Sequence, residues 1–201
     1  MARTAKRKTV WTVLGIASIL AAALLLFLYS GLYNVSAADP DAGLIQWSLQ
    51  TAQERSVHRR ARSVEVPDLS DPALIREGIA HYHFMCIGCH GSPGTPSSEI
   101  GQGLNPYPPE LANEALKESD AEVFWVIKNG IRMTGMPAFG LTHEDEDLWA
   151  LVAFLRKLPQ LSQGEYQALI EKAGIGVPRP PAAPGSVMPE LSEAELQAHQ
   201  H

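Results

Sequence analysis

The sequence of 201 residues is poor in cysteine and contains only Cys86 and Cys89. Two cysteines cannot build a disulfide framework, and a structural zinc site would need two further ligands at close spacing. Basic residues are outnumbered: 16 Lys and Arg stand against 22 Asp and Glu, for a formal net charge of −6. The chain therefore lacks the excess of positive charge that indicates nucleic-acid binding. It also lacks internal repeats, so we expect one main domain with accessory segments.

Both cysteines lie in the segment Cys86-Ile87-Gly88-Cys89-His90. Two thiols separated by two residues and followed by an imidazole form the pattern that attaches a c-type haem through two thioether bonds. A thioredoxin-like dithiol needs a βαβ setting, and nothing strand-rich surrounds Cys86. A disulfide between Cys86 and Cys89 would close a very small, strained loop. We therefore expect these cysteines to bind one haem c covalently, with His90 as an axial ligand of the iron.

A second ligand is expected in the segment Met133-Thr134-Gly135-Met136-Pro137. A low-spin electron-transfer haem needs a sixth ligand, and a thioether raises the reduction potential of the iron. Gly135 and Pro137 favour an extended loop that turns the Met136 sulfur inward. Met136 is thus the predicted axial ligand and Met133 the alternative. Without a haem, both would be ordinary core methionines.

Charged residues are absent from Thr9 through Ala38. The 24 positions from Val10 to Tyr33 are overwhelmingly apolar, and as a helix they would extend about 36 Å, enough to cross a bilayer core of about 30 Å. A cleaved signal peptide is the alternative, with small residues at Val35-Ser36-Ala37, but its apolar region is usually about 7 to 15 residues long. We expect an uncleaved transmembrane anchor.

Orientation follows from the basic residues that flank this span. Four precede it, and the first one after it is Arg55. The rule that basic residues stay in the cytoplasm places the N-terminus inside and the rest of the chain outside. The expected location is a bacterial cytoplasmic membrane, crossed once, with the remaining domain in the periplasm or at the outer face.

We divide the chain into an anchor (1–33), an extracytoplasmic connector (34–70), a haem domain (71–160) and a Pro-rich C-terminal extension (161–201). The connector is expected to contain a helix from Gly43 to Ala61. Its basic cluster either binds anionic headgroups or a partner subunit, or is a solvated helix face; the cluster comprises Arg55, His58, Arg59, Arg60 and Arg62. In the extension, helices are expected from Ser162 to Ala173 and again from Glu190 to His201.

Capping signals predict three helices in the haem domain. The first is expected to be capped by Asp71, to begin at Pro72 and to deliver Cys86 to the haem. The second begins with a capping box at Ser119 and ends at Asn129-Gly130. The third is expected to be capped by Thr142 and stopped by Pro159.

The haem domain also contains aromatic and imidazole side chains outside these motifs. His81 and His83 precede the attachment site, and we expect them on other helix faces. Trp125 packs either on a haem or in an ordinary core. Between Gly91 and Pro109 we expect an ordered loop, in which a backbone carbonyl from residues 104–109 accepts the second ring N–H of His90.

Together these features resemble a class I monohaem cytochrome c over residues 71–159, of the membrane-anchored bacterial type. The resemblance implies an all-α cytochrome c fold around a covalent haem, with Cys86 and Cys89 as attachment residues and His90 and Met136 as axial ligands. It also implies that Gly78 allows the first and last helices to cross closely near Tyr82 and Trp149.

The expected function is one-electron transfer in a respiratory or dehydrogenase-linked chain, without enzymatic activity or a small-molecule substrate. Acidic residues outnumber basic ones by twelve to six between Asp71 and Gln160, which favours a redox partner with a basic docking patch. One alternative is a permanent cytochrome subunit of a larger dehydrogenase or oxidase. Another is a haem sensor or peroxidase whose methionine leaves the iron.

Overall fold

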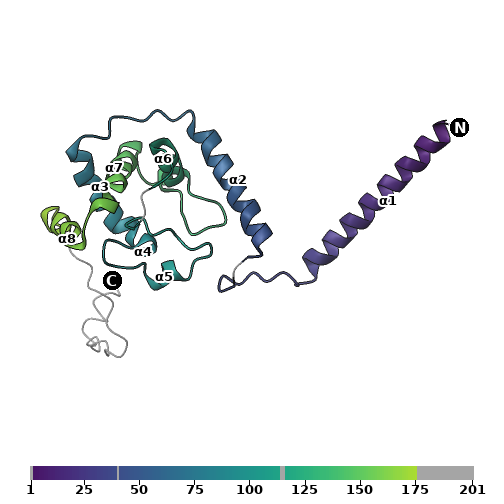
Figure 1. Ribbon diagram of the computed structural model, residues 1–201, viewed down its shortest axis with the longest axis horizontal. Coiled ribbons are helices and arrows are strands. Elements are labelled where there is room, and N and C mark those ends of the chain that lie inside the picture. Colours follow the sequence, from purple (N-terminus) through teal and green to yellow (C-terminus); the bar gives the residue numbers. More distant parts are fainter. Residues whose placement is uncertain (1, 40, 114–115, 176–201) are drawn as a thin grey trace, which may run out of the picture.

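The computed structural model describes residues 2–39, 41–113 and 116–175. Within these ranges the chain is helical and has no strand, only an isolated bridge between Ser92 and Thr95. This confirms the expected all-α fold (Figure 1). In chain order the elements are α1 (Ala2–Tyr29), α2 (Gly43–Ala61), α3 (Pro72–Met85), α4 (Ile87–His90), α5 (Glu99–Gln102), α6 (Asp120–Asn129), η1 (Phe139–Leu141), α7 (Asp145–Lys157), η2 (Leu158–Gln160) and α8 (Gln163–Lys172).

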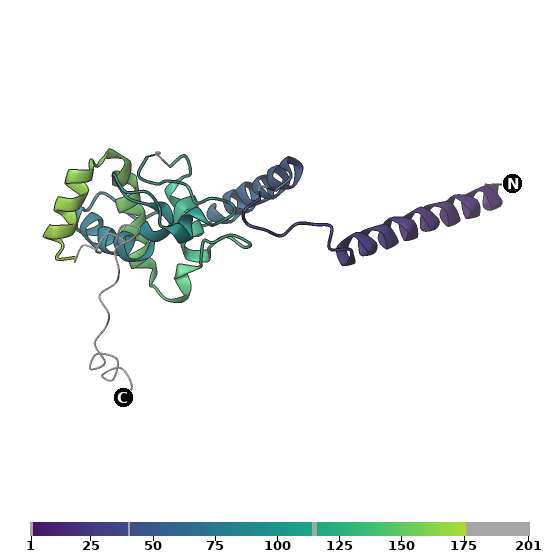
Figure 2. The ribbon, with the colours of Figure 1, turned by 90° about the horizontal axis from the view of Figure 1, so that it is seen from below.

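Helix α1 extends away from the other helices in both views (Figures 1 and 2). Its segment Lys6–Tyr29, 24 residues long, is long and apolar enough to cross a membrane. The predicted span, Val10 to Tyr33, ends later in the sequence than the observed helix. The helix stops at Tyr29, and Gly31 has a φ of 70°, which belongs to the left-handed region and ends a helix readily.

Helix α2 occupies the predicted range, Gly43–Ala61. Its C-terminal half packs against α6 and buries Val57 and Ala61. The imidazole Nδ1 of His58 lies 2.9 Å from a carboxylate oxygen of Glu122 on α6. The second half of α2 therefore belongs to the folded domain, although the connector was expected to be separate from it.

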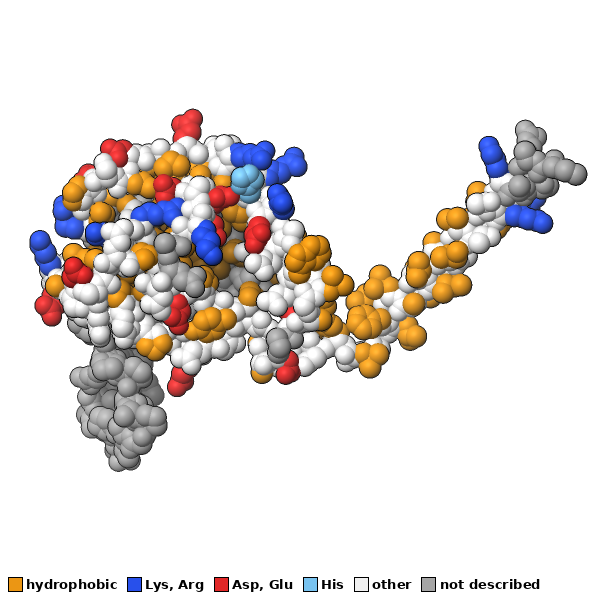
Figure 3. All heavy atoms as spheres, viewed as in Figure 1, with side chains coloured by type: hydrophobic (Ala, Val, Ile, Leu, Met, Phe, Trp, Pro, Cys, Tyr) orange, Lys and Arg blue, Asp and Glu red, His pale blue; other side chains and the backbone are white. Residues whose placement is uncertain are grey.

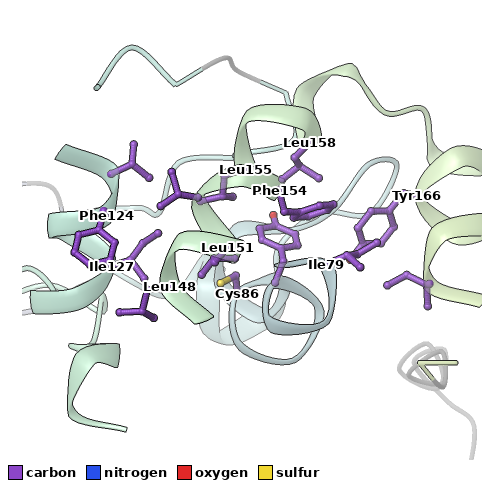
Figure 4. Packing of buried hydrophobic residues seen from close by; sticks show 14 of the residues in the cluster. Ile79, Cys86, Phe124, Ile127, Leu148, Leu151, Phe154, Leu155, Leu158 and Tyr166 are labelled. Carbon is purple, nitrogen blue, oxygen red and sulfur yellow. The ribbon is translucent and has the colours of Figure 1, made fainter. Parts of the chain in front are cut away.

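The core is centred on the crossing of α3 and α7 (Figure 4). A methyl group on Gly78 would lie 2.0 Å from the Ala150 carbonyl oxygen, so only glycine permits this approach. Tyr82 and Phe154 are fully buried on either side of the crossing, with ring centroids 5.4 Å apart. Burial of one such side chain stabilises the fold by about 1.5–3 kcal/mol. The close crossing predicted at Gly78 is confirmed.

Local capping explains where most helices begin. The Asp71 carboxylate accepts a hydrogen bond from the Ala73 amide, and Ser119 forms a capping box with Glu122. The prediction that Thr142 caps α7 is wrong. The cap is Glu144, whose backbone N–H bonds to the Asp147 carboxylate, while Thr142 Oγ1 donates to the Phe139 carbonyl.

Helix α8 begins with a second capping box, between Ser162 and Glu165. It packs on α3 and buries Tyr166 and Ile170. The first helix of the C-terminal extension is thus confirmed and is part of the domain core. The helix expected from Glu190 to His201 lies outside the described residues.

Candidate haem-binding site

Helix α3 carries the chain from the core to Cys86. Tyr82 lies one turn before this cysteine, and its hydroxyl donates a 2.7 Å hydrogen bond to the carbonyl oxygen of Gly91. Gly91, which follows His90, is buried and has a φ of 67°. The segment from Cys86 to His90 is therefore held to the α3/α7 core at both of its ends.

Within this segment, α4 forms a single helical turn. The amide of His90 donates to the Cys86 carbonyl at 2.8 Å, and the two thiols form no disulfide. Cys86 lies in the core cluster, whereas Cys89 is half-buried (Figure 4). Burial, and then the nearby Cys89, raise the pKa of the Cys86 thiol to about 12. Redox-active Cys-x-x-Cys pairs have low-pKa thiols instead, so the dithiol interpretation is disfavoured.

One ring nitrogen of His90 forms a hydrogen bond to the backbone, and the other remains available as a metal ligand. Its Nδ1–H donates a 2.8 Å hydrogen bond to the carbonyl oxygen of Pro109. This confirms the prediction that a backbone carbonyl from residues 104–109 orients the ring. Burial lowers the pKa of His90, and the Pro109 hydrogen bond opposes that shift only in part. The imidazole is consequently neutral near pH 7 and has an unshared electron pair on Nε2, as a metal ligand requires.

A short helix that the sequence did not reveal supports the Cys86–His90 segment from the other side. The hydroxyl and the amide of Ser98, the N-cap of α5, both donate to the Gly88 carbonyl, at 2.6 and 2.9 Å. Gly101 of α5 lies so close that a methyl group there would be 2.9 Å from Cys89 Cα. Any side chain at Gly101 would thus push α5 away from the attachment segment.

The two methionines of the 131–138 loop lie in different environments. Met136 is half-buried and packs against the core, whereas Met133 is 83% exposed. Met133 also has a φ of 62°, in the left-handed region. Thr134 closes the loop: its hydroxyl donates to the Ile131 carbonyl at 2.8 Å and accepts from the Met136 amide at 3.1 Å.

Aromatic residues of α6 and α7 pack together beside this loop. The rings of Phe124 and Trp149 are stacked, with centroids 4.0 Å apart. Trp125, the next residue on α6, is half-buried and lines a surface pocket together with Phe124 and Trp149. Phe124 therefore belongs to the core, and Trp149 packs against it.

Neither of the two histidines on α3 adjoins His90 in this arrangement. His81 Nε2 lies 3.5 Å from an Asp147 carboxylate oxygen on α7. His83 is buried, and its Nδ1 lies 3.2 Å from the Tyr166 hydroxyl of α8. Both imidazoles therefore connect α3 to neighbouring helices, as expected for other helix faces.

These features define the class of the protein: a helical haem-binding domain with a single Cys-x-x-Cys-His segment. Residues 73–155 match the family described as cytochrome c oxidase, cbb3-type, subunit III. The matched range lies within the expected haem domain and includes all four predicted haem-binding residues. No curated protein matches the chain. The match supports a monohaem c-type cytochrome domain over this part of the chain.

Proposed function

We propose that the protein is a membrane-anchored electron carrier in which Cys86 and Cys89 bind one haem covalently, with His90 and Met136 as axial ligands. The observation that carries this proposal is the hydrogen bond from His90 Nδ1 to the Pro109 carbonyl. It fixes the ring and its tautomer, so that Nε2 is the nitrogen left for the iron.

The residues present fit a haem c by the chemistry of their donor atoms. Two thiols, one neutral imidazole and one thioether match the attachment and ligation of such a haem. When bound, it supplies a one-electron Fe(III)/Fe(II) couple. Hydrogen bonds hold the two axial donors in place: the Pro109 carbonyl orients His90, and the Thr134 hydroxyl accepts from the backbone amide of Met136. Filling both axial positions leaves no open site for a substrate, which favours a carrier over an enzyme.

Between the two methionines, exposure and backbone geometry favour Met136. We predict that Met136→Ala abolishes the near-infrared sulfur-to-iron charge-transfer band of the oxidised protein, because the second axial ligand is lost. Met133→Ala, at the exposed position, should leave the band unchanged and is the matched control. The measurement is an absorption spectrum of each purified variant. A band that persists in Met136→Ala and disappears in Met133→Ala would reverse the assignment.

Covalent attachment is tested by intact mass. Expressed in a host competent for cytochrome maturation, the chain should have the mass of the polypeptide plus one haem. Replacing both Cys86 and Cys89 by alanine should abolish this mass increase even if some haem still binds. A wild-type protein with the mass of the bare polypeptide would overturn the proposal.

We further propose that α1 is an uncleaved anchor and that the haem domain lies on the periplasmic side. Lys6, Arg7 and Lys8 precede the span, and the next basic residue is Arg55. Hydrogen bonds from Tyr33 to Asp41 and from Asn34 to Asp39 cross the position where a signal peptidase would cut. A cleaved chain would lose both. N-terminal sequencing of the membrane fraction distinguishes the two forms.

A permanent subunit of an oxidase is the second candidate, because the matching family is described as an oxidase subunit. In that case the protein should co-migrate with larger chains after extraction in mild detergent. A free carrier should migrate alone. For a free carrier, the acidic excess of the domain favours a partner with a basic docking patch, so the association rate should fall as salt increases.

A further inference from the structure

The N-terminal half of α2 exposes apolar side chains that the folded domain does not use. Leu44, Trp47 and Leu49 are 74%, 64% and 53% exposed. These residues point in different directions around the helix, so exposed apolar side chains alternate with the neutral polar Gln46, Ser48 and Gln50 instead of forming one apolar face. No charged residue occurs from Ala42 to Gln53. We call this end, residues 43–50, the apolar tip.

The two ends of α2 differ sharply in character (Figure 3). The C-terminal half of α2 carries the basic cluster, with Arg55, Arg59 and Arg60 exposed. It is held against α6 by Val57, Ala61 and His58. The apolar tip projects from the domain on the side of α1 (Figures 1 and 2). With a rise of about 1.5 Å per residue, Trp47 and Arg59 are about 18 Å apart along the helix.

The connector between α1 and α2 is folded back on itself. The Tyr33 hydroxyl donates to the Asp41 carboxylate at 2.9 Å, and the Asn34 amide donates to Asp39 at 2.7 Å. These bonds keep the start of α2 near the end of the span. Leu32, Tyr33 and Val35 are themselves exposed, so the apolar surface continues from α1 toward the tip.

The connector is also bonded to the haem domain. The side-chain amide of Asn105 donates to the Asp39 carbonyl at 3.1 Å. Asn105 belongs to the loop that ends with Pro109, the hydrogen-bond acceptor of His90. The anchor, the tip and the loop beside His90 are thus linked by short-range bonds.

We infer that the apolar tip of α2 inserts into the interfacial layer of the lipid bilayer and holds the haem domain in one orientation to the membrane. This inference rests on the proposed membrane anchor. Tryptophan and neutral polar side chains next to leucine suit the headgroup region, where exposed apolar surface is removed from water. The occupant is lipid because the tip is continuous with a membrane span and carries no charge for a protein partner to pair.

A consequence concerns the basic cluster. With the tip in the interface and the helix rising from it, Arg59 lies up to about 18 Å farther out, beyond the Debye length of about 8 Å at physiological salt. Headgroup binding by the cluster is then disfavoured, and its exposed arginines Arg55, Arg59 and Arg60 face the solvent, where a protein partner can reach them.

The test uses the full-length holoprotein in phosphatidylcholine nanodiscs. Trp47→Cys is labelled with a nitroxide and compared with Leu20→Cys in α1 as the lipid reference and Arg59→Cys as the water reference. Collision rates with oxygen and with a nickel chelate are measured in the oxidised protein, and the relaxation that the haem iron causes, recorded without either reagent, is subtracted. The oxygen-to-nickel ratio at position 47 should be several-fold higher than at position 59.

A ratio at position 47 equal to that at position 59 would overturn the inference and indicate a protein partner as the occupant. Lipid-like values at both positions would show that α2 lies flat, and would overturn the proposed orientation. The unsubstituted holoprotein provides the control for the proposed function. If the unsubstituted protein takes up the nitroxide, Cys86 and Cys89 are free thiols and the haem assignment fails. If it takes up none, water-like collision values at position 47 refute this inference and leave the haem assignment intact.

Discussion

The two segments that present the proposed axial ligands are built differently. His90 ends α4, the short helix that follows α3, one of the two helices that cross at the centre of the core. Its own ring donates to the Pro109 carbonyl, and the carbonyl of the next residue, Gly91, accepts from Tyr82. Met136 belongs to a loop whose hydrogen bonds are mainly internal, through Thr134 and Ile131. The histidine side therefore depends on the stability of the whole domain, whereas the methionine side can open locally. An electron carrier needs both axial positions filled, but only the methionine side can open and admit another ligand.

The largest expected effect comes from breaking the helix crossing that supports His90. Gly78→Ala places a methyl group 2.0 Å from the Ala150 carbonyl oxygen, which the backbone of α7 cannot avoid without moving. We predict a loss of about 3 kcal/mol or more in the free energy of unfolding, at or above the upper end for overpacking. Denaturant titration of the holoprotein measures it.

Gly164→Ala in α8 is the matched control, because a methyl group there meets nothing within 4 Å. Alanine is the better helix former, so this variant should be unchanged or up to about 1 kcal/mol more stable. Equal losses at Gly78 and Gly164 would contradict the close crossing.

A smaller effect is expected from Tyr82→Phe, which removes only the hydroxyl that bonds the chain after His90. The ring keeps its place against Phe154, but the buried Gly91 carbonyl loses its 2.7 Å donor. An unsatisfied buried acceptor costs about 1–3 kcal/mol. Tyr33→Phe removes an exposed hydrogen bond to Asp41 and should change the stability by less than about 0.5 kcal/mol. Similar losses in both variants would show that burial of the Tyr82 bond is unimportant.

The same contrast explains how much could be predicted from the sequence. The signals at Asp71, Ser119 and Ser162 act within four residues, so the starts of α3, α6 and α8 were predictable. The attachment motif, Cys86 to His90, is likewise recognisable from adjacent residues alone. The cap of α7 was mistaken because Thr142 is a favoured N-cap residue and Glu144 is not. Thr142 instead donates its hydroxyl to the Phe139 carbonyl of η1, and Glu144 pairs with Asp147 in a capping box.

Features that depend on distant contacts were not predictable. Helix α5 is only four residues long, and its cap residue Ser98 is held by the Gly88 carbonyl, ten residues away. The packing of α2 on α6 joins His58 to Glu122, 64 residues apart. Nothing in the composition of the connector indicates this contact. The region of the His90 acceptor could be anticipated, but its identity as Pro109 depends on the path of the whole loop.

A third prediction opens the methionine side alone. Thr134→Val removes both hydrogen bonds of the Thr134 hydroxyl, which close the loop around Met136. A net loss of about 1 kcal/mol raises the population of the open loop about fivefold. Carbon monoxide binding to the reduced protein, limited by dissociation of the sulfur, should accelerate by a similar factor. Global stability should fall by no more than the same amount, about 1 kcal/mol, because the unfolded chain lacks these bonds as well.

Thr142→Val makes the same chemical change at an exposed hydroxyl in the turn before α7. It should leave the rate of carbon monoxide binding at the wild-type value. Acceleration by both variants would mean that the Thr134 bonds are not what holds Met136.

The smallest expected effect is a pH dependence on the histidine side, at the junction of α3 and α8. Burial lowers the pKa of His83, and its Nε2 has no hydrogen-bond partner among the described residues. The unfolded chain takes up this proton near pH 6.5, before the folded protein does. Stability should therefore be full above about pH 6.5 and fall as the pH decreases toward the lowered pKa. Thermal melts of His83→Gln should show a flatter pH dependence, whereas Tyr166→Phe, which keeps the imidazole, should be less stable at every pH with the wild-type slope.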